Sequence, residues 1–98
     1  MAVFLTSRPF SGVRQIKYEQ LLETNPDWVA EVPKDELEDY LRTLEQRYQS
    51  RCYQLVEDGL EKALAENPQI QGTAEHFALG EQLAEQAREI AMRELLDA

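Results

Sequence analysis

His76 and Cys52 carry the most reactive side chains of this sequence, and neither has the neighbours that catalysis requires. His76 is the lone histidine, and it has no Glu-x-x-His pair or nearby cysteine to complete a metal site. Cys52 is the lone cysteine and lies on the apolar side of a helical pattern, where the reactive thiolate is disfavoured. We therefore interpret His76 as a structural side chain and Cys52 as a residue that fills the core.

Carboxylates recur at three- and four-residue steps, a spacing that could hold a divalent cation with help from a second helix. They are Asp35, Glu36, Glu38 and Asp39, and later Glu94 and Asp97. The same spacing is common on solvated helix faces, so we interpret them as surface charges. The sequence has no glycine-rich phosphate loop and no supported Ser/His/Asp set. It therefore predicts no catalytic, cofactor-binding or metal-binding residues, and a metalloenzyme with carboxylates from two chains is only a third hypothesis.

The charge balance restricts the partners. The 98 residues include 10 basic and 19 acidic side chains, a formal charge of −9, which argues against binding to nucleic acid or to anionic lipid. It is compatible with a basic protein partner, and it also simply favours solubility. Because there is one cysteine, no long apolar run and no signal-like N-terminus, we expect a cytoplasmic protein that does not span a membrane.

The longest regular pattern predicts one helix over residues 34–66. Pro33 and the acidic residues after it favour a helix start, and Asn67-Pro68 favours its end. At about 1.5 Å per residue this helix would be about 50 Å long, more than one small core can cover. Its apolar stripe widens after Cys52, where Tyr53 joins it, so we expect this half to be buried on more than one side.

A second helix is predicted over residues 74–97, with Thr73 as its N-cap and an apolar stripe that begins at Phe77. Both helices carry small residues on one face, which predicts a tightly packed antiparallel hairpin. The predicted seam consists of Cys52, Gly59, Ala63, Gly80, Ala84, Ala87 and Ala91. A turn at residues 69 and 70 would place Arg51 opposite Glu89. Arg51 belongs to a basic ridge on the first helix, and Glu89 belongs to an acidic ridge on the second.

Residues 1–32 differ from the rest and form an N-terminal arm of a single helical domain that spans 1–98. Three basic residues and no acidic one precede Glu19, so the arm could lie across the acidic helices. We predict a short helix over about 12–23 capped by Ser11, and a turn at Asn25-Pro26. Trp28 is expected to pack on the base of the long helix or to anchor a partner. The candidate interface residues are Phe4, Trp28, Leu37, Tyr40, Leu41 and Leu44.

These features together predict an all-α protein: the long hairpin of 33–98, the short N-terminal helix and an irregular arm, assembled as a helical-bundle dimer. The first functional hypothesis is a non-enzymatic protein that acts through protein–protein contacts, as an adaptor, an assembly factor or a structural subunit. Its partner is another protein or a second copy of itself. The alternative is an acidic inhibitor or antitoxin-like protein that occupies a basic nucleic-acid-binding site on a partner.

Overall fold

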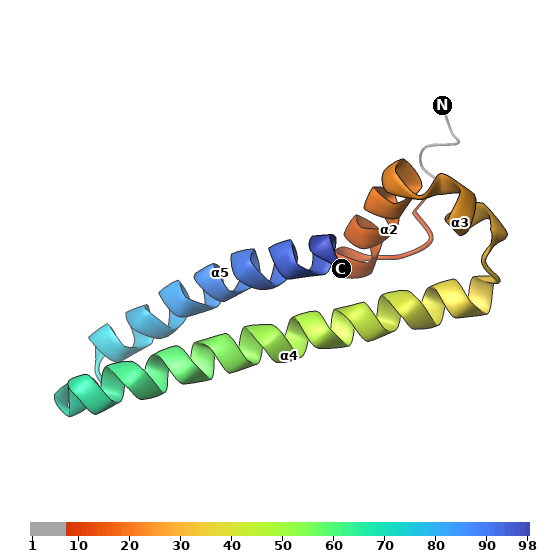
Figure 1. Ribbon diagram of the computed structural model, residues 1–98. Helices are drawn as coiled ribbons and strands as arrows, with labels where there is room; N and C mark the ends of the chain where they lie inside the picture. The colour runs from red at the N-terminus through yellow and green to blue at the C-terminus, as the bar shows by residue number, and fades with distance from the viewer. Residues whose placement is uncertain (1–7) are drawn as a thin grey trace. The chain divides into compact units, whose positions relative to one another are not determined.

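The computed structural model describes residues 8–98, which are helical throughout and contain no strand (Figure 1). The all-α prediction is therefore confirmed. The helices in chain order are α2 (Gly12–Thr24), α3 (Pro26–Glu31), α4 (Lys34–Glu66), the short 3₁₀ helix η1 (Pro68–Ile70) and α5 (Ala74–Asp97). Phe4, a predicted interface residue, lies outside the described residues. Close contacts divide the chain into two units, 1–46 and 47–98, and the boundary between them falls inside α4.

The helix ends show which sequence signals act locally. Thr73 caps α5, since its hydroxyl oxygen accepts a hydrogen bond from the backbone N–H of His76 at 3.3 Å. Gly72 precedes it with a φ of +78°, a left-handed conformation that favours glycine. Ser11 occupies the predicted N-cap position of α2, but its side chain makes no capping hydrogen bond, and neither does that of Asn25, the N-cap residue of α3. Pro26, at the start of α3, supplies the preset backbone angle instead.

The first unit is organised around a small apolar cluster between α2 and the start of α4. Leu21 from α2 meets Leu37 and Leu41 from α4, and all three are almost completely buried. Five partly buried side chains cover this cluster: Phe10, Tyr18, Val29, Val32 and Tyr40. The base of the long helix is therefore covered by residues from the N-terminal arm of the same chain.

Polar residues of α2 are also drawn into this unit. Arg14 Nε lies 3.4 Å from a carboxylate oxygen of Glu45 on α4, a charge contact without hydrogen-bond geometry. Lys17 is only 2% exposed, and its ammonium donates to Gln20 Oε1 at 2.8 Å. Of these two basic residues, Arg14 contacts an acidic residue of α4, whereas Lys17 is bonded within α2.

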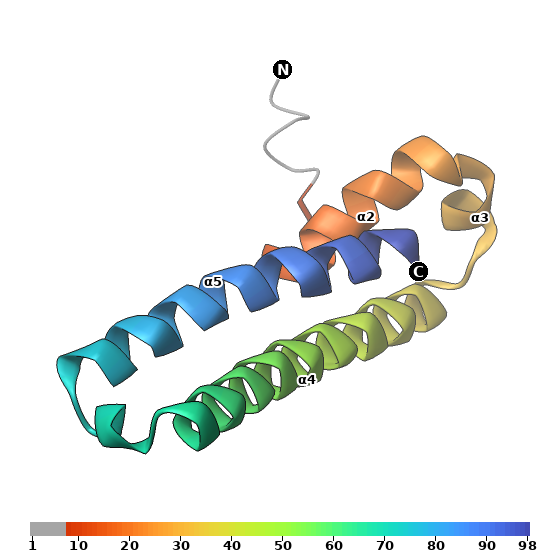
Figure 2. The same ribbon diagram turned by 60° about the vertical axis from the view of Figure 1, so that its left-hand side comes forward.

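In the second unit, the C-terminal part of α4 runs beside α5 in both views (Figures 1 and 2). Leu83 of α5 lies directly over Gly59 of α4. A Cβ atom placed on Gly59 would be 2.8 Å from Leu83 Cδ2, so only glycine leaves room for this contact. The α5 residues Ala87, Ala91 and Leu95 are buried. A hydrophobic side chain over a glycine, rather than two facing small residues, therefore brings the helices together here.

Candidate functional site

A groove of two adjoining hollows lies between α4 and α5 in the second unit. The Phe77 hollow, of about 410 Å³, is lined by Leu60, Gly72, Thr73, His76, Phe77, Gly80, Glu81 and Ala84. The Tyr53 hollow, of about 390 Å³, is lined by Tyr48, Gln49, Cys52, Tyr53, Val56, Ala84 and Arg88. Both hollows include Ala84, so they form one continuous feature, which we call the α4–α5 groove.

Two aromatic side chains of the groove are unusually exposed. Phe77 is 73% exposed and Tyr53 is 67% exposed, although both belong to the apolar stripes that the sequence predicts to be buried. Soluble proteins tolerate single exposed apolar residues, but two exposed rings beside adjoining hollows make this groove the candidate binding surface. Phe77 and Tyr53 are the candidate functional residues that the sequence reasoning missed. The widening of the α4 stripe after Cys52 was the signal, since it predicted burial on a second side.

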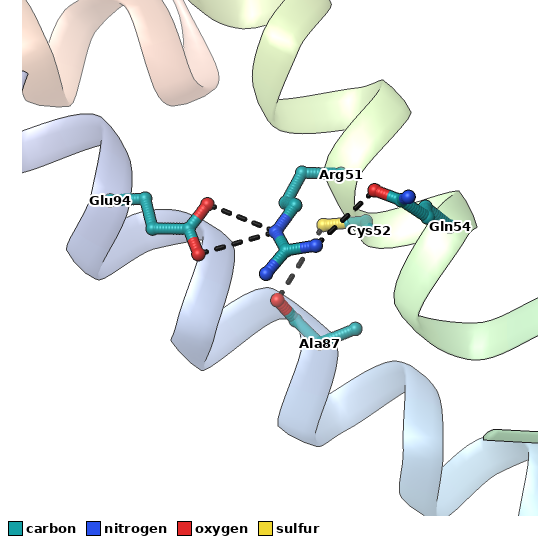
Figure 3. Close-up of polar contacts among 5 residues, drawn as sticks. All are labelled: Arg51, Cys52, Gln54, Ala87 and Glu94. Carbon is teal, nitrogen blue, oxygen red and sulfur yellow. Dashed lines mark hydrogen bonds and ion pairs between the residues drawn. The ribbon is translucent and has the colours of Figure 1, made fainter. Parts of the chain in front are cut away.

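Below the groove, a set of polar contacts joins the two helices (Figure 3). Arg51 Nε on α4 donates to both carboxylate oxygens of Glu94 on α5, at 3.1 and 3.2 Å. The thiol of Cys52 donates to the backbone carbonyl of Ala87 at 3.8 Å. Arg51 therefore pairs with Glu94 and not with the predicted Glu89. The long side chain of Arg51 reaches along α5 to Glu94. The predicted turn at residues 69 and 70 places Arg88 opposite Cys52, and the short Cys52 side chain contacts the adjacent residue, Ala87.

The phenol of Tyr48 lies in the wall of the Tyr53 hollow, beside Cys52 and Arg88. Partial burial, followed by the nearby Cys52 thiol, raises the pKa of Tyr48 above its usual value of 10.0, while the guanidinium of Arg88 opposes this rise. Tyr48 is therefore neutral at physiological pH and contributes a hydroxyl group to the wall of the groove.

His76 stands at the edge of the Phe77 hollow in a structural role. Its Nδ1 atom accepts a hydrogen bond from the backbone N–H of Gly72 at 3.0 Å, and this bond joins the turn to the first residues of α5. Between residues 8 and 98, no group of three or more His, Cys, Asp or Glu side chains could hold a metal ion. The surface exposed inside the two hollows is mainly apolar.

The predicted interface residues fall into two groups. Leu37, Leu41 and Leu44 are 7%, 1% and 4% exposed, so they offer no side-chain surface to a second chain. Trp28 is 37% exposed, and its ring packs edge-to-face on Tyr40 with 5.4 Å between the ring centroids. The tryptophan therefore packs on the base of the long helix, as one of its two interpretations predicts, and keeps one edge in solvent.

The predicted seam residues also divide. Cys52, Gly59 and Ala87 take part in the α4–α5 contacts described above, Ala91 is buried and Ala63 is half-buried. Gly80 and Ala84 instead line the groove, and no atom lies within 4 Å of the position that a Cβ on Gly80 would occupy. Small residues that the sequence assigned to packing between these helices are therefore available to an incoming helix.

Comparison of the chain with models of protein families, with curated proteins and with solved structures finds no match. In the described part of the chain, no helix combines the length and the apolar character needed to cross a membrane.

Proposed function

We propose that this chain is a non-enzymatic protein-interaction module, an adaptor, assembly factor or structural subunit, whose α4–α5 groove receives a helix of a protein partner. In this proposal the C-terminal part of α4 and α5 act as an antiparallel helical hairpin. The observation that carries the proposal is the exposure of Phe77 and Tyr53, at 73% and 67%, beside hollows that meet at Ala84. A groove between two helices is a shape that an amphipathic helix fits.

Burial of the two exposed rings would contribute a substantial part of the binding free energy. Complete burial of one large apolar side chain contributes about 1.5–3 kcal/mol, so the two rings together contribute about 3–6 kcal/mol. Since about 1.4 kcal/mol changes an equilibrium constant tenfold, their burial alone changes affinity by a factor of roughly 10² to 10⁴. Aromatic residues at the centre of an interface are frequent hot spots, which matches the positions of Phe77 and Tyr53.

A photo-crosslinking experiment in cells tests this function. The photoreactive amino acid p-benzoylphenylalanine replaces Phe77, whose ring it resembles, and in a matched control it replaces Glu61, an exposed α4 residue that lines neither hollow. We expect irradiation to give a discrete protein adduct from position 77 and little from position 61. Equal adduct yields at the two positions would contradict the proposed function.

The charge of the chain supports a second candidate, an acidic inhibitor or antitoxin-like protein that covers a basic site. Outside the Arg51 contact, α5 carries a set of exposed carboxylates at Glu75, Glu81, Glu85, Glu89 and Asp97. Association through these charges should weaken steeply as salt screens them, whereas binding through the apolar groove should change little. Adduct yield from position 77 in lysates at low and high salt distinguishes the two candidates. In either case we propose a reducing, cytoplasmic setting, in which Cys52 stays a thiol.

A further inference from the structure

We propose that the helix received by the α4–α5 groove is α5 of a second copy of this chain, docked antiparallel to the first α5. The inference rests on the proposed function, because it names the partner for the same groove. Four residues of α5 that line the hollows carry the argument. They are Phe77, Glu81, Ala84 and Arg88.

The spacing of these four residues is that of a helix–helix seam. They follow one another at steps of four, three and four residues, the alternation that keeps one stripe of a helix facing a partner helix. Ala87, Ala91 and Leu95 are buried in the single chain, while Phe77, Glu81 and Arg88 are exposed. Helix α5 therefore carries a second seam that the single chain leaves open.

An antiparallel copy pairs every member of this seam. A two-fold axis between Glu81 and Ala84 places Phe77 against Arg88 of the second copy, and Glu81 against its Ala84. The guanidinium over the ring face is a favourable cation–π arrangement. Glu81 then lies about one helical turn, ~5.4 Å, from Arg88 of the second copy, within reach of that long side chain. The two-fold symmetry makes each of these contacts twice.

Charge complementarity favours a second copy of α5 over a partner helix whose charged residues all have the same sign. Glu81 and Arg88 form no hydrogen bond or ion pair with the part of the chain that the structure describes. A uniformly basic helix would neutralise Glu81 but place a like charge against Arg88, and a uniformly acidic helix would do the reverse. An antiparallel α5 carries both charges in reversed order, so it neutralises both.

The backbone also permits a close approach. Gly80 lies beside the seam and has open space around its Cα, and the central position of the seam is Ala84. Small side chains at these points allow two helices to pack near the lower end of the usual 8–10 Å separation. At that separation Phe77 of each copy can enter the space next to Tyr53 and Val56 of the other.

Charge reversal tests the pairing. Light scattering on a sizing column should give wild type a mass of twice 11.3 kDa that dissociates on dilution. In E81R and in R88E two like-charge contacts replace two attractive ones, so we expect the dissociation constant of each variant to rise about tenfold or more. The double variant E81R/R88E, and an equimolar mixture of the two single variants, restore the opposite-charge contacts and should recover most of the lost affinity, less the share of the cation–π contacts that R88E removes.

The matched controls are E61R and K62E, which make the same charge changes at exposed α4 positions outside both hollows. These controls should dimerise as wild type does. A monomeric wild type, single reversals no weaker than the controls, or a mixture that fails to recover would overturn the inference. If the dimer is refuted but photo-crosslinking from position 77 captures a different protein, the proposed function stands without this inference. If position 77 gives no adduct at all, both the proposed function and the inference are refuted.

Discussion

Two glycines on the facing helices of the second unit should respond oppositely to the same substitution. Alanine is more favourable than glycine in a helix interior by about 1 kcal/mol. Gly80 has no atom within 4 Å of its would-be Cβ, so Gly80→Ala should raise the free energy of unfolding by this amount. For a chain of this size the midpoint of thermal unfolding should then rise by about 4–8 °C.

Gly59→Ala gains the same helix propensity but meets Leu83. The new Cβ would lie 2.8 and 2.9 Å from the two terminal methyl carbons of Leu83 and 3.4 Å from its Cγ, so the leucine must leave its position. Overpacking of this kind costs about 1–3 kcal/mol. The net effect should lie between neutral and about 2 kcal/mol of destabilisation, at least about 1 kcal/mol below that of Gly80→Ala.

Urea unfolding followed by circular dichroism measures both variants, at two protein concentrations so that any change in self-association is detected. The L83A background supplies the control, since removal of the leucine side chain should convert Gly59→Ala into a stabilising change of about 1 kcal/mol. Equal stabilisation by Gly59→Ala and Gly80→Ala in the wild-type background would refute the contact between Leu83 and Gly59.

Two other predictions concern the core of the first unit and the groove wall. Leu41→Ala removes a side chain that is 1% exposed and should lower the free energy of unfolding by about 2–5 kcal/mol, whereas Leu22→Ala, at 41% exposed, should cost well under half as much in the same urea titration. A similar loss in both would contradict the assigned core. Because the pKa of Tyr48 is raised in the folded chain, its contribution to stability is present below pH 10 and is lost as pH rises through the folded-state pKa. Tyr48→Phe should therefore flatten the alkaline fall in unfolding free energy, and an unchanged pH profile would refute the assignment.

Helix boundaries were predictable because local chemistry sets them. The predicted ranges 34–66 and 74–97 match α4 and α5, and the helix predicted over 12–23 is one residue longer in the structure. Proline punctuation decides these ends: Pro33 precedes α4, and Asn67-Pro68 follows it. Thr73 also acts as the predicted cap. Signals of this kind act over a few residues and do not depend on the rest of the fold.

Exposure was harder to predict, because apolar periodicity identifies a face without saying what covers it. Phe77 and Tyr53 follow helical spacing as well as Leu41 does, yet the two aromatic residues are exposed and the leucine is buried. The difference comes from the N-terminal arm, which covers Leu41 with Leu21. Three of the residues predicted at the interface, Leu37, Leu41 and Leu44, are buried within the chain. Gly80, predicted in the seam, has no atom within 4 Å of its would-be Cβ.

The distribution of buried residues explains why the groove lies where it does. The buried residues of α4 all precede Gln46, and those of α5 begin at Ala87. Between these points no residue of α4 or α5 is buried, and the buried residue of this stretch is Ile70 of the short helix η1. Two helices can bury one stripe each, and a complete core needs a further layer. The α4–α5 groove, with Phe77 and Tyr53 exposed, occupies this same stretch. The partner helix of the proposed function would therefore cover the stretch in which the chain leaves its own aromatic side chains exposed.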